Sequence, residues 1–214
     1  TGCTAASMAA TLTGLGADAI GVNCSLGPAQ LLPILKEIGE ISPLPIIVKP
    51  NAGLPDPVDG HYDVAPAEFA AAMAEAVAAG VSVIGGCCGT NPDYIRALHE
   101  RVKDMTPGDR EIRRTSMVCT ATQAVEISGV RVIGERINPT GKKPFKEALK
   151  AHDIDYILRE GLSQQEQGVH VLDVNVGLPE IDEVATMRQL VGRIQGVVSL
   201  PLQIDSSDPA AIEA

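Results

Sequence analysis

Apolar residues recur along the chain in short β-branched runs that alternate with longer segments of helical periodicity. In the first half, runs ending near Cys24, Lys49 and Ile84 are separated by segments rich in Ala and Leu. Alternation of this kind is typical of βα units around a parallel sheet. The third run breaks into Gly85-Gly-Cys-Cys-Gly-Thr90, and Pro92 then begins another helix.

The pattern dissolves between residues 104 and 130, where Pro, Gly, charged and Ser/Thr residues mix, and then it resumes. Helical periodicity continues to about residue 167 and returns over residues 182–194. Strand-like runs occur three times in this half, at residues 130–135, 169–173 and 201–205.

We therefore predict an α/β chain built from parts of two barrels. Residues 1–103 form the C-terminal part of one (β/α)8 TIM barrel, residues 104–130 a linker, and residues 131–214 the N-terminal part of a second. Each series is shorter than the roughly 250 residues of a complete barrel. Because Thr1 and Ala214 both fall inside apparent elements, we expect a piece of a longer polypeptide, which by itself would expose strand edges and be poorly soluble or inactive.

Three cysteines follow strands of the first series. Cys24 ends the first run, and Cys87 and Cys88 follow the third run between glycines. In parallel sheets and barrels the carboxyl ends of the strands open on one face, so these thiols can converge. Three convergent thiolates predict zinc with one open position, which favours alkylation of a bound substrate thiol over activation of water.

Other residues that could bind zinc also have a purely structural interpretation. Asn51, in the loop after the second strand, either lends an oxygen to zinc when substrate is absent or is only a turn residue. His61 and His99 are candidates by residue type alone. Cys3 and Cys119 are interpreted as small buried hydrophobic residues.

The composition limits which classes of partner and which cellular compartment we expect. The formal net charge is −10 over 214 residues, without a stripe of Lys and Arg, which argues against nucleic acid. No apolar run reaches the roughly 18 residues of a membrane span. Five cysteines with an adjacent pair favour reduced metal-binding thiols. We expect a cytoplasmic protein whose partners are small molecules or proteins, with no nucleic acid and no membrane.

The cysteine motifs resemble those of homocysteine S-methyltransferase domains, in the right order and each at a strand end, over residues 1 to about 103. The resemblance implies that homocysteine binds through its sulfur to zinc held by Cys24, Cys87 and Cys88. The motifs are Gly21-Val-Asn-Cys-Ser25, Lys49-Pro-Asn-Ala-Gly-Leu-Pro55 and Gly85-Gly-Cys-Cys-Gly-Thr90.

Motifs in the second half resemble the pterin-binding barrel of methyltetrahydrofolate methyltransferases, which is related in fold to dihydropteroate synthase. A zinc barrel followed by a pterin barrel is similar to the order in cobalamin-dependent methionine synthases. This implies methyl transfer from 5-methyltetrahydrofolate to homocysteine through cobalamin, carried by another domain or a corrinoid protein. The motifs are Gly134-Glu-Arg-Ile-Asn-Pro-Thr-Gly141, Leu172-Asp-Val-Asn-Val-Gly177 and Leu202-Gln-Ile-Asp-Ser-Ser207.

Within these motifs, four polar residues are candidates for pterin binding. Asp173 and Asn175 lie two apart at a strand end and point to one side, and Asp205 ends the next strand. They offer acceptors and an amide to the amino-pyrimidinone edge, and Asn138 adds a contact from a neighbouring loop. Asp173 is alternatively a structural acid, and Asp205 alternatively a helix N-cap, although residues 206–208 already supply one.

Other interpretations remain open. A zinc methyltransferase fused to a methylenetetrahydrofolate reductase would contain flavin, and the motif at residues 134–141 argues against it. A corrinoid-dependent methyltransferase with another thiol acceptor is a further alternative. A structural zinc module beside a small-molecule-binding barrel would fill all four zinc positions with protein atoms. Glu135 and Arg136 are interpreted as an ion pair beneath the pocket.

Overall fold

The structure, a computed structural model, describes residues 2–113 and 115–214 and divides into two compact units. One unit comprises residues 5–115, and the other comprises residues 1–4 and 116–214. Both contain a parallel sheet with helices, which confirms the α/β prediction. In the described part of the chain, every helix is too short or too polar to cross a membrane.

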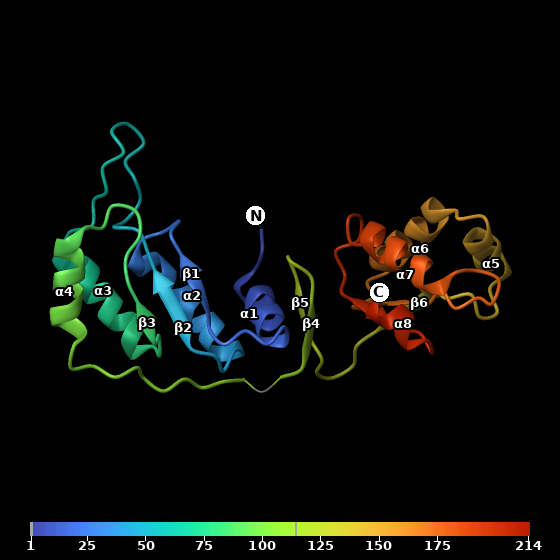
Figure 1. Ribbon diagram of the computed structural model, residues 1–214, viewed down its shortest axis with the longest axis horizontal. Helices are drawn as coiled ribbons and strands as arrows, with labels where there is room; N and C mark the ends of the chain where they lie inside the picture. The colour runs from blue at the N-terminus through green and yellow to red at the C-terminus, as the bar shows by residue number, and fades with distance from the viewer. Residues whose placement is uncertain (1, 114) are drawn as a thin grey trace. The chain divides into compact units, whose positions relative to one another are not determined.

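The first unit is built on three parallel strands in the order β1-β2-β3 (Figure 1). Ile20 pairs with Ile46, and Ile47 pairs with Val83, which sets the register. Its elements, in chain order, are α1 (Ala5–Gly14), β1 (Ile20–Asn23), α2 (Pro28–Ile41), β2 (Ile46–Lys49), α3 (Pro66–Ala78), β3 (Val83–Ile84) and α4 (Pro92–Val102).

Only one face of this sheet is covered by the helices. Ile46 and Val48 point to that face and are completely buried, together with Leu35 of α2 and Met73 of α3. Val83 lies in register with Ile47 on the other face and is 49% exposed. Val83 is exposed although its run is apolar, because side chains alternate between the two faces of a strand.

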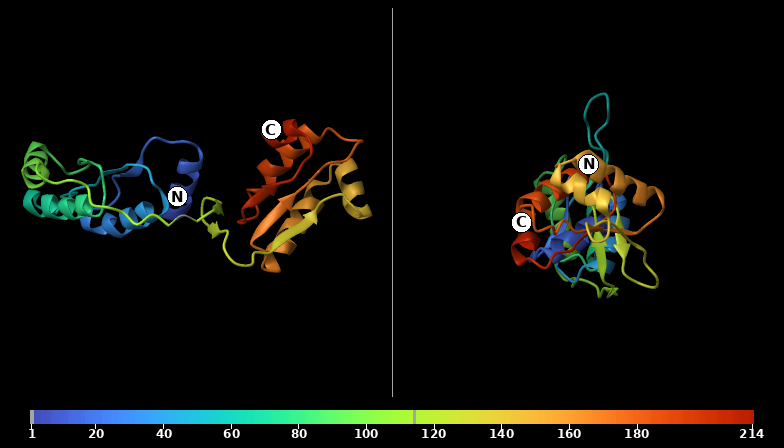
Figure 2. Two further views of the ribbon diagram at one scale, coloured as in Figure 1. Left: turned by 90° about the horizontal axis from the view of Figure 1, so that it is seen from below. Right: turned by 90° about the vertical axis from the view of Figure 1, so that its right-hand side faces the viewer.

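The second unit has a short antiparallel hairpin, β4 (Met117–Cys119) with β5 (Ala124–Glu126), and a parallel sheet in the order β6-β7-β8. Figure 2 shows the helices of this unit over one face of the sheet, where Ile157, Leu190 and Ile194 pack against Leu172 and Val174. The remaining elements are β6 (Ile133–Ile137), α5 (Lys143–Lys150), α6 (Ile154–Glu166), β7 (Val171–Val174), α7 (Glu183–Ile194), β8 (Leu202–Ile204) and α8 (Pro209–Glu213).

Two details of this unit differ from the sequence analysis. The helical region expected up to residue 167 is interrupted at His152, whose φ of 52° ends one helix before Asp153 caps the next. Cys119 is half-buried and Cys3 is exposed, so the prediction that both are buried is wrong. Cys119 lies on a two-stranded hairpin, and a ribbon of two strands encloses little apolar volume.

Part of the segment expected to be a linker is bound to the first unit. We call residues 108–113 the strap. The N–H of Gly108 donates to the Val77 carbonyl at 2.9 Å. The Arg110 guanidinium donates to the carbonyls of Ser42, Pro43 and Leu44 at 3.2, 3.2 and 2.9 Å. The strap therefore satisfies carbonyl groups between α2 and β2 that would otherwise depend on water.

Candidate functional sites

The structure brings together the three cysteines that the sequence singled out. Cys24 follows β1, and Cys87 and Cys88 follow β3, with β2 between the two strands. The Sγ atoms of Cys24 and Cys88 are 3.6 Å apart, those of Cys87 and Cys88 are 3.9 Å apart, and all three lie within 4.8 Å of one another. We call this group the thiol cluster.

The loop after β2 fixes the two cysteines that follow β3. The N–H of Cys87 donates to the Pro50 carbonyl at 2.8 Å, and the Cys88 carbonyl accepts from the Ala52 N–H at 2.9 Å. The Oδ1 of Asn51, a residue only 4% exposed, accepts from the Cys88 N–H at 3.2 Å. Asn51 therefore lies beside the thiol cluster and orients its backbone, while its role as a zinc ligand stays a prediction.

Cys24 is presented by an unusual backbone conformation. Its φ is 66° and that of Ser25 is 65°, both in the left-handed region that residues other than Gly, Asn and Asp seldom adopt. The Cys24 N–H still donates to the Lys49 carbonyl at 2.8 Å, so the strand pairing continues up to the turn. The turn places the Cys24 sulfur beside that of Cys88.

The sulfurs perturb one another's protonation. The pKa of Cys24 is lowered, chiefly by the backbone N–H of Ser25 and then by hydrogen bonds from Cys88 and Cys87. The pKa of Cys88 is raised, first by its hydrogen bonds with Cys24 and Cys87 and then by their negative charge. Negative charge on its neighbours therefore opposes ionisation of Cys88, and a cation between the sulfurs would offset that opposition.

The geometry of the thiol cluster suits zinc. With Zn–S bonds of about 2.3 Å, tetrahedral coordination separates two sulfurs by about 3.8 Å, and two of the three pairs here lie at 3.6 and 3.9 Å. Among the described residues, this is the group of metal-binding side chains that comes together, and neither His61 nor His99 belongs to it.

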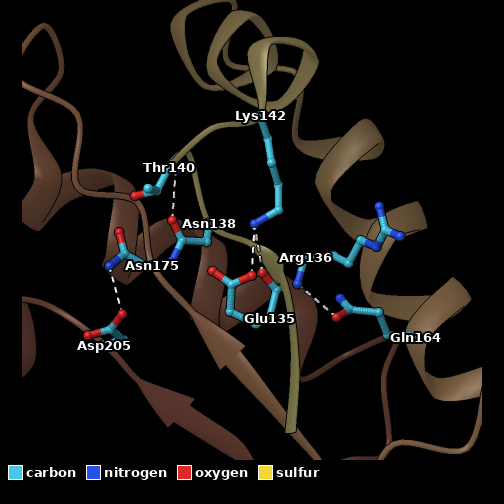
Figure 3. Close-up of polar contacts among 8 residues, drawn as sticks. All are labelled: Glu135, Arg136, Asn138, Thr140, Lys142, Gln164, Asn175 and Asp205. Atoms are coloured by element: carbon cyan, nitrogen blue, oxygen red, sulfur yellow. Dashed lines mark hydrogen bonds and ion pairs between the residues drawn. The ribbon is translucent and has the colours of Figure 1, made fainter.

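A second group of polar side chains lies at the ends of β7 and β8. Gln203 is in register with Asp173, and its Nε2 donates to Asp173 Oδ1 at 2.7 Å. Asn175 Nδ2 donates to Asp205 Oδ2 at 2.8 Å, as Figure 3 shows. We call these four residues the carboxylate–amide cluster. Asp205 is not the cap of α8, since Asp208 accepts from the Ala210 N–H there.

Asp173 is the residue of this cluster with a shifted acidity. It is only 4% exposed, and its pKa is raised, mainly by burial and then by the negative charge of Asp205. The hydrogen bond from Gln203 acts in the opposite direction, and Glu135 and Lys142 contribute smaller effects. Asp173 therefore holds its proton more strongly than an exposed aspartate does.

Two neighbours of this cluster come from β6 and the loop after it. Asn138 is 8% exposed, and its Oδ1 accepts from the Thr140 N–H at 2.8 Å. Glu135 pairs with Lys142 at 2.9 Å, whereas Figure 3 shows the Arg136 side chain directed away from it. The predicted Glu135–Arg136 ion pair is wrong, because successive side chains of a strand point to opposite faces.

Sequence reasoning missed Gln203 and Lys142. Gln203 lies two positions before Asp205 on the same strand, so the two-residue period places both side chains on one face and could have identified Gln203. Lys142 carries no such signal. Its contact with Glu135 depends on how the loop after β6 folds back.

Known proteins match both halves of the chain. Residues 1–102 match the homocysteine S-methyltransferase family, and residues 134–214 match the pterin binding enzyme family. Along the chain, a match to homocysteine S-methyltransferases is thus followed by a match to pterin binding enzymes. Both resemblances inferred from the motifs are confirmed, and so is the fold class, because both families are barrel enzymes of the predicted type.

Individual relatives match across both parts. The chain is 36% identical over 206 residues to the methionine synthase of Mycobacterium tuberculosis, covering 94% of this chain and 17% of the relative. It is 37% identical over 211 residues to the methionine synthase of Mycobacterium leprae, covering 94% of this chain and 18% of the relative. The chain thus spans about one sixth of the length of these relatives.

Proposed function

We propose that this chain takes part in the transfer of a methyl group from 5-methyltetrahydrofolate, through cobalamin, to the thiol of homocysteine, giving methionine and tetrahydrofolate. The observation that carries the proposal is the thiol cluster, whose sulfurs have the spacing that zinc requires. The cluster lies in the part of the chain that matches homocysteine S-methyltransferases.

In this proposal Cys24, Cys87 and Cys88 hold Zn²⁺ and leave one position for the sulfur of homocysteine. Bound zinc supplies positive charge that favours the thiolate form of the substrate at neutral pH. The protein contributes the positions of the three sulfurs, through the turn at Cys24 and the Asn51 contact to the Cys88 backbone. Cys88 is exposed, so homocysteine has access to this side of the cluster.

The carboxylate–amide cluster is proposed to bind the pterin ring. Ionised carboxylates accept hydrogen bonds from the ring's N–H groups, and amides both donate and accept. The Asn175–Asp205 bond holds the Asp205 carboxylate in one orientation before the ligand arrives. The match to pterin binding enzymes over residues 134–214 supports this assignment and favours a folate barrel over a fused reductase.

Cobalamin is proposed as the carrier of the methyl group between the two sites. It would be supplied by another domain or by a corrinoid protein, which has to reach each site in turn. The names of the relatives, both methionine synthases, support the overall reaction.

The test is zinc K-edge X-ray absorption on the full-length protein, with and without homocysteine. We expect one oxygen or nitrogen neighbour of zinc to be replaced by sulfur when homocysteine is added. The Cys88→Ser variant should contain little zinc, whereas Cys119→Ser, which alters a thiol outside the cluster, should match the wild type. A zinc shell that homocysteine does not change would make the site structural and overturn the proposal. A change with another small thiol, but not with homocysteine, would reassign the acceptor.

A further inference from the structure

The loop between β2 and α3 returns to the thiol cluster. Figure 1 shows this loop, coloured teal, extending beyond the helices of the first unit and coming back. Pro55 and Tyr62 form an isolated antiparallel bridge at its base, and the Asp56 N–H donates to the His61 carbonyl at 2.7 Å. The bridge fixes where the returning strand of the loop delivers Tyr62.

The ring of Tyr62 lies against the glycine that follows the cysteine pair. A Cβ atom added to Gly89 would lie 2.3 Å from Cγ of Tyr62 and 2.6 Å from its Cδ2, far inside van der Waals contact. Gly89 also has a φ of 78°, which disfavours a side chain. The absence of a side chain at residue 89 therefore makes room for an aromatic ring beside Cys88.

The hydroxyl of Tyr62 reaches the sulfur of Cys88. The two side chains are close enough to interact, as expected from a ring that lies against Gly89, the residue next to Cys88. A ligating thiolate has no proton to give, so in a hydrogen bond between them the phenol hydroxyl of Tyr62 is the donor. The rest of the ring packs against the core of the first unit, which limits its movement.

We propose that Tyr62 is a positioning residue of the metal site, whose hydroxyl donates a hydrogen bond to the Cys88 sulfur while its ring closes the Gly89 side. This inference rests on the proposed function, because it requires the thiol cluster to hold a metal ion. A hydrogen bond to a ligating sulfur withdraws electron density from it, so Cys88 would donate less charge to the metal. The metal would then attract an incoming thiolate more strongly.

The test uses Co²⁺ in place of zinc, in the full-length protein prepared without cobalamin. Sulfur-to-cobalt charge-transfer bands in the near ultraviolet report the electron density on the thiolates. We expect Tyr62→Phe to shift these bands to lower energy, because the sulfur loses its hydrogen bond. Gly89→Ala, which displaces the ring, should shift them in the same direction.

Tyr94→Phe is the matched control. The Tyr94 hydroxyl donates to the Val64 carbonyl at 2.7 Å and its ring packs on Phe69, so this variant loses one hydroxyl in the same unit without touching a sulfur. Its bands should coincide with those of the wild type. Unchanged bands in a cobalt-loaded Tyr62→Phe protein would overturn the proposed role of Tyr62 and leave the metal site standing. A wild-type protein that shows no sulfur-to-cobalt bands would instead overturn the metal site and the proposed function.

Discussion

The thiol cluster and the carboxylate–amide cluster both lie at the ends of parallel strands, yet they differ in the partners that their acidic groups have. The thiols contact mainly one another, so negative charge on one sulfur opposes ionisation of the next. In the carboxylate–amide cluster each acid already accepts from an amide, Asp173 from Gln203 and Asp205 from Asn175. A cation would therefore stabilise the ionised form of the first site, whereas a ligand of the second site would have to replace hydrogen bonds that the acids already make.

The largest expected effect comes from removing one thiolate. Cys88→Ser should weaken zinc binding by more than about 100-fold, because even residues that only support metal ligands are worth about 10–100-fold. Competition with a chromophoric chelator measures this. Asp205→Asn should leave zinc affinity unchanged, and a Cys88→Ser protein that binds zinc as the wild type does would contradict the proposed ligand set.

The corresponding change in the other site is Asp205→Asn. We expect tetrahydrofolate to bind about 10–100-fold more weakly, since a hydrogen bond to a charged group contributes about 1.5–3 kcal/mol. Isothermal titration calorimetry measures the affinity. Asp208→Asn, three residues on, alters the cap of α8 and should leave folate affinity intact. Equal losses in both variants would mean that Asp205 acts only through the local fold.

The strap provides a way to change the stability of the first unit without touching its sulfurs. Arg110→Ala should lower the free energy of unfolding by about 1–3 kcal/mol, because three carbonyls lose a charged donor. Arg113→Ala removes only an exposed ion pair with Glu40 and should cost less than about 1 kcal/mol. Urea unfolding measures both. Zinc affinity should stay at the wild-type value in each, and a parallel loss of zinc would couple the strap to the site.

The smallest effect concerns the pH dependence of stability. Because the pKa of Asp173 is raised in the folded protein, its favourable contribution is complete below the unfolded value and is lost as pH rises through the folded value. Asp173→Asn removes this loss, so the variant should gain stability relative to the wild type between about pH 4, near the unfolded pKa of about 3.9, and pH 7. Thermal unfolding across this range tests it, and parallel curves for the two proteins would refute it.

The strand-and-helix pattern was sufficient to place the cysteines. Cys24 ends one apolar run and Cys87 closely follows another, and parallel strands present such ends on one face, so their meeting follows from local sequence and general topology. The same reasoning located Asp173, Asn175 and Asp205 at strand ends. Whether these side chains bind a pterin remains a prediction.

The sequence pattern could not predict the contacts that loops make. The Tyr62 ring meets Gly89 only because the loop after β2 folds back through the Pro55 bridge. Lys142 meets Glu135 for a similar reason, and the strap binds the first unit through backbone carbonyls, which every residue type possesses. Tertiary packing decides such contacts, and hydrophobic periodicity contains no information about them.

The left-handed turn at Cys24 has a consequence for how this sequence can change over time. A cysteine at φ 66° costs on the order of 1 kcal/mol or more in backbone strain, which Gly would relieve without disturbing the strand. The backbone conformation at this position therefore favours glycine over cysteine. In a lineage in which these thiols no longer have a role, genetic drift should replace Cys24 with Gly or Asn early, before the cysteines at positions 87 and 88, neither of which has a positive φ.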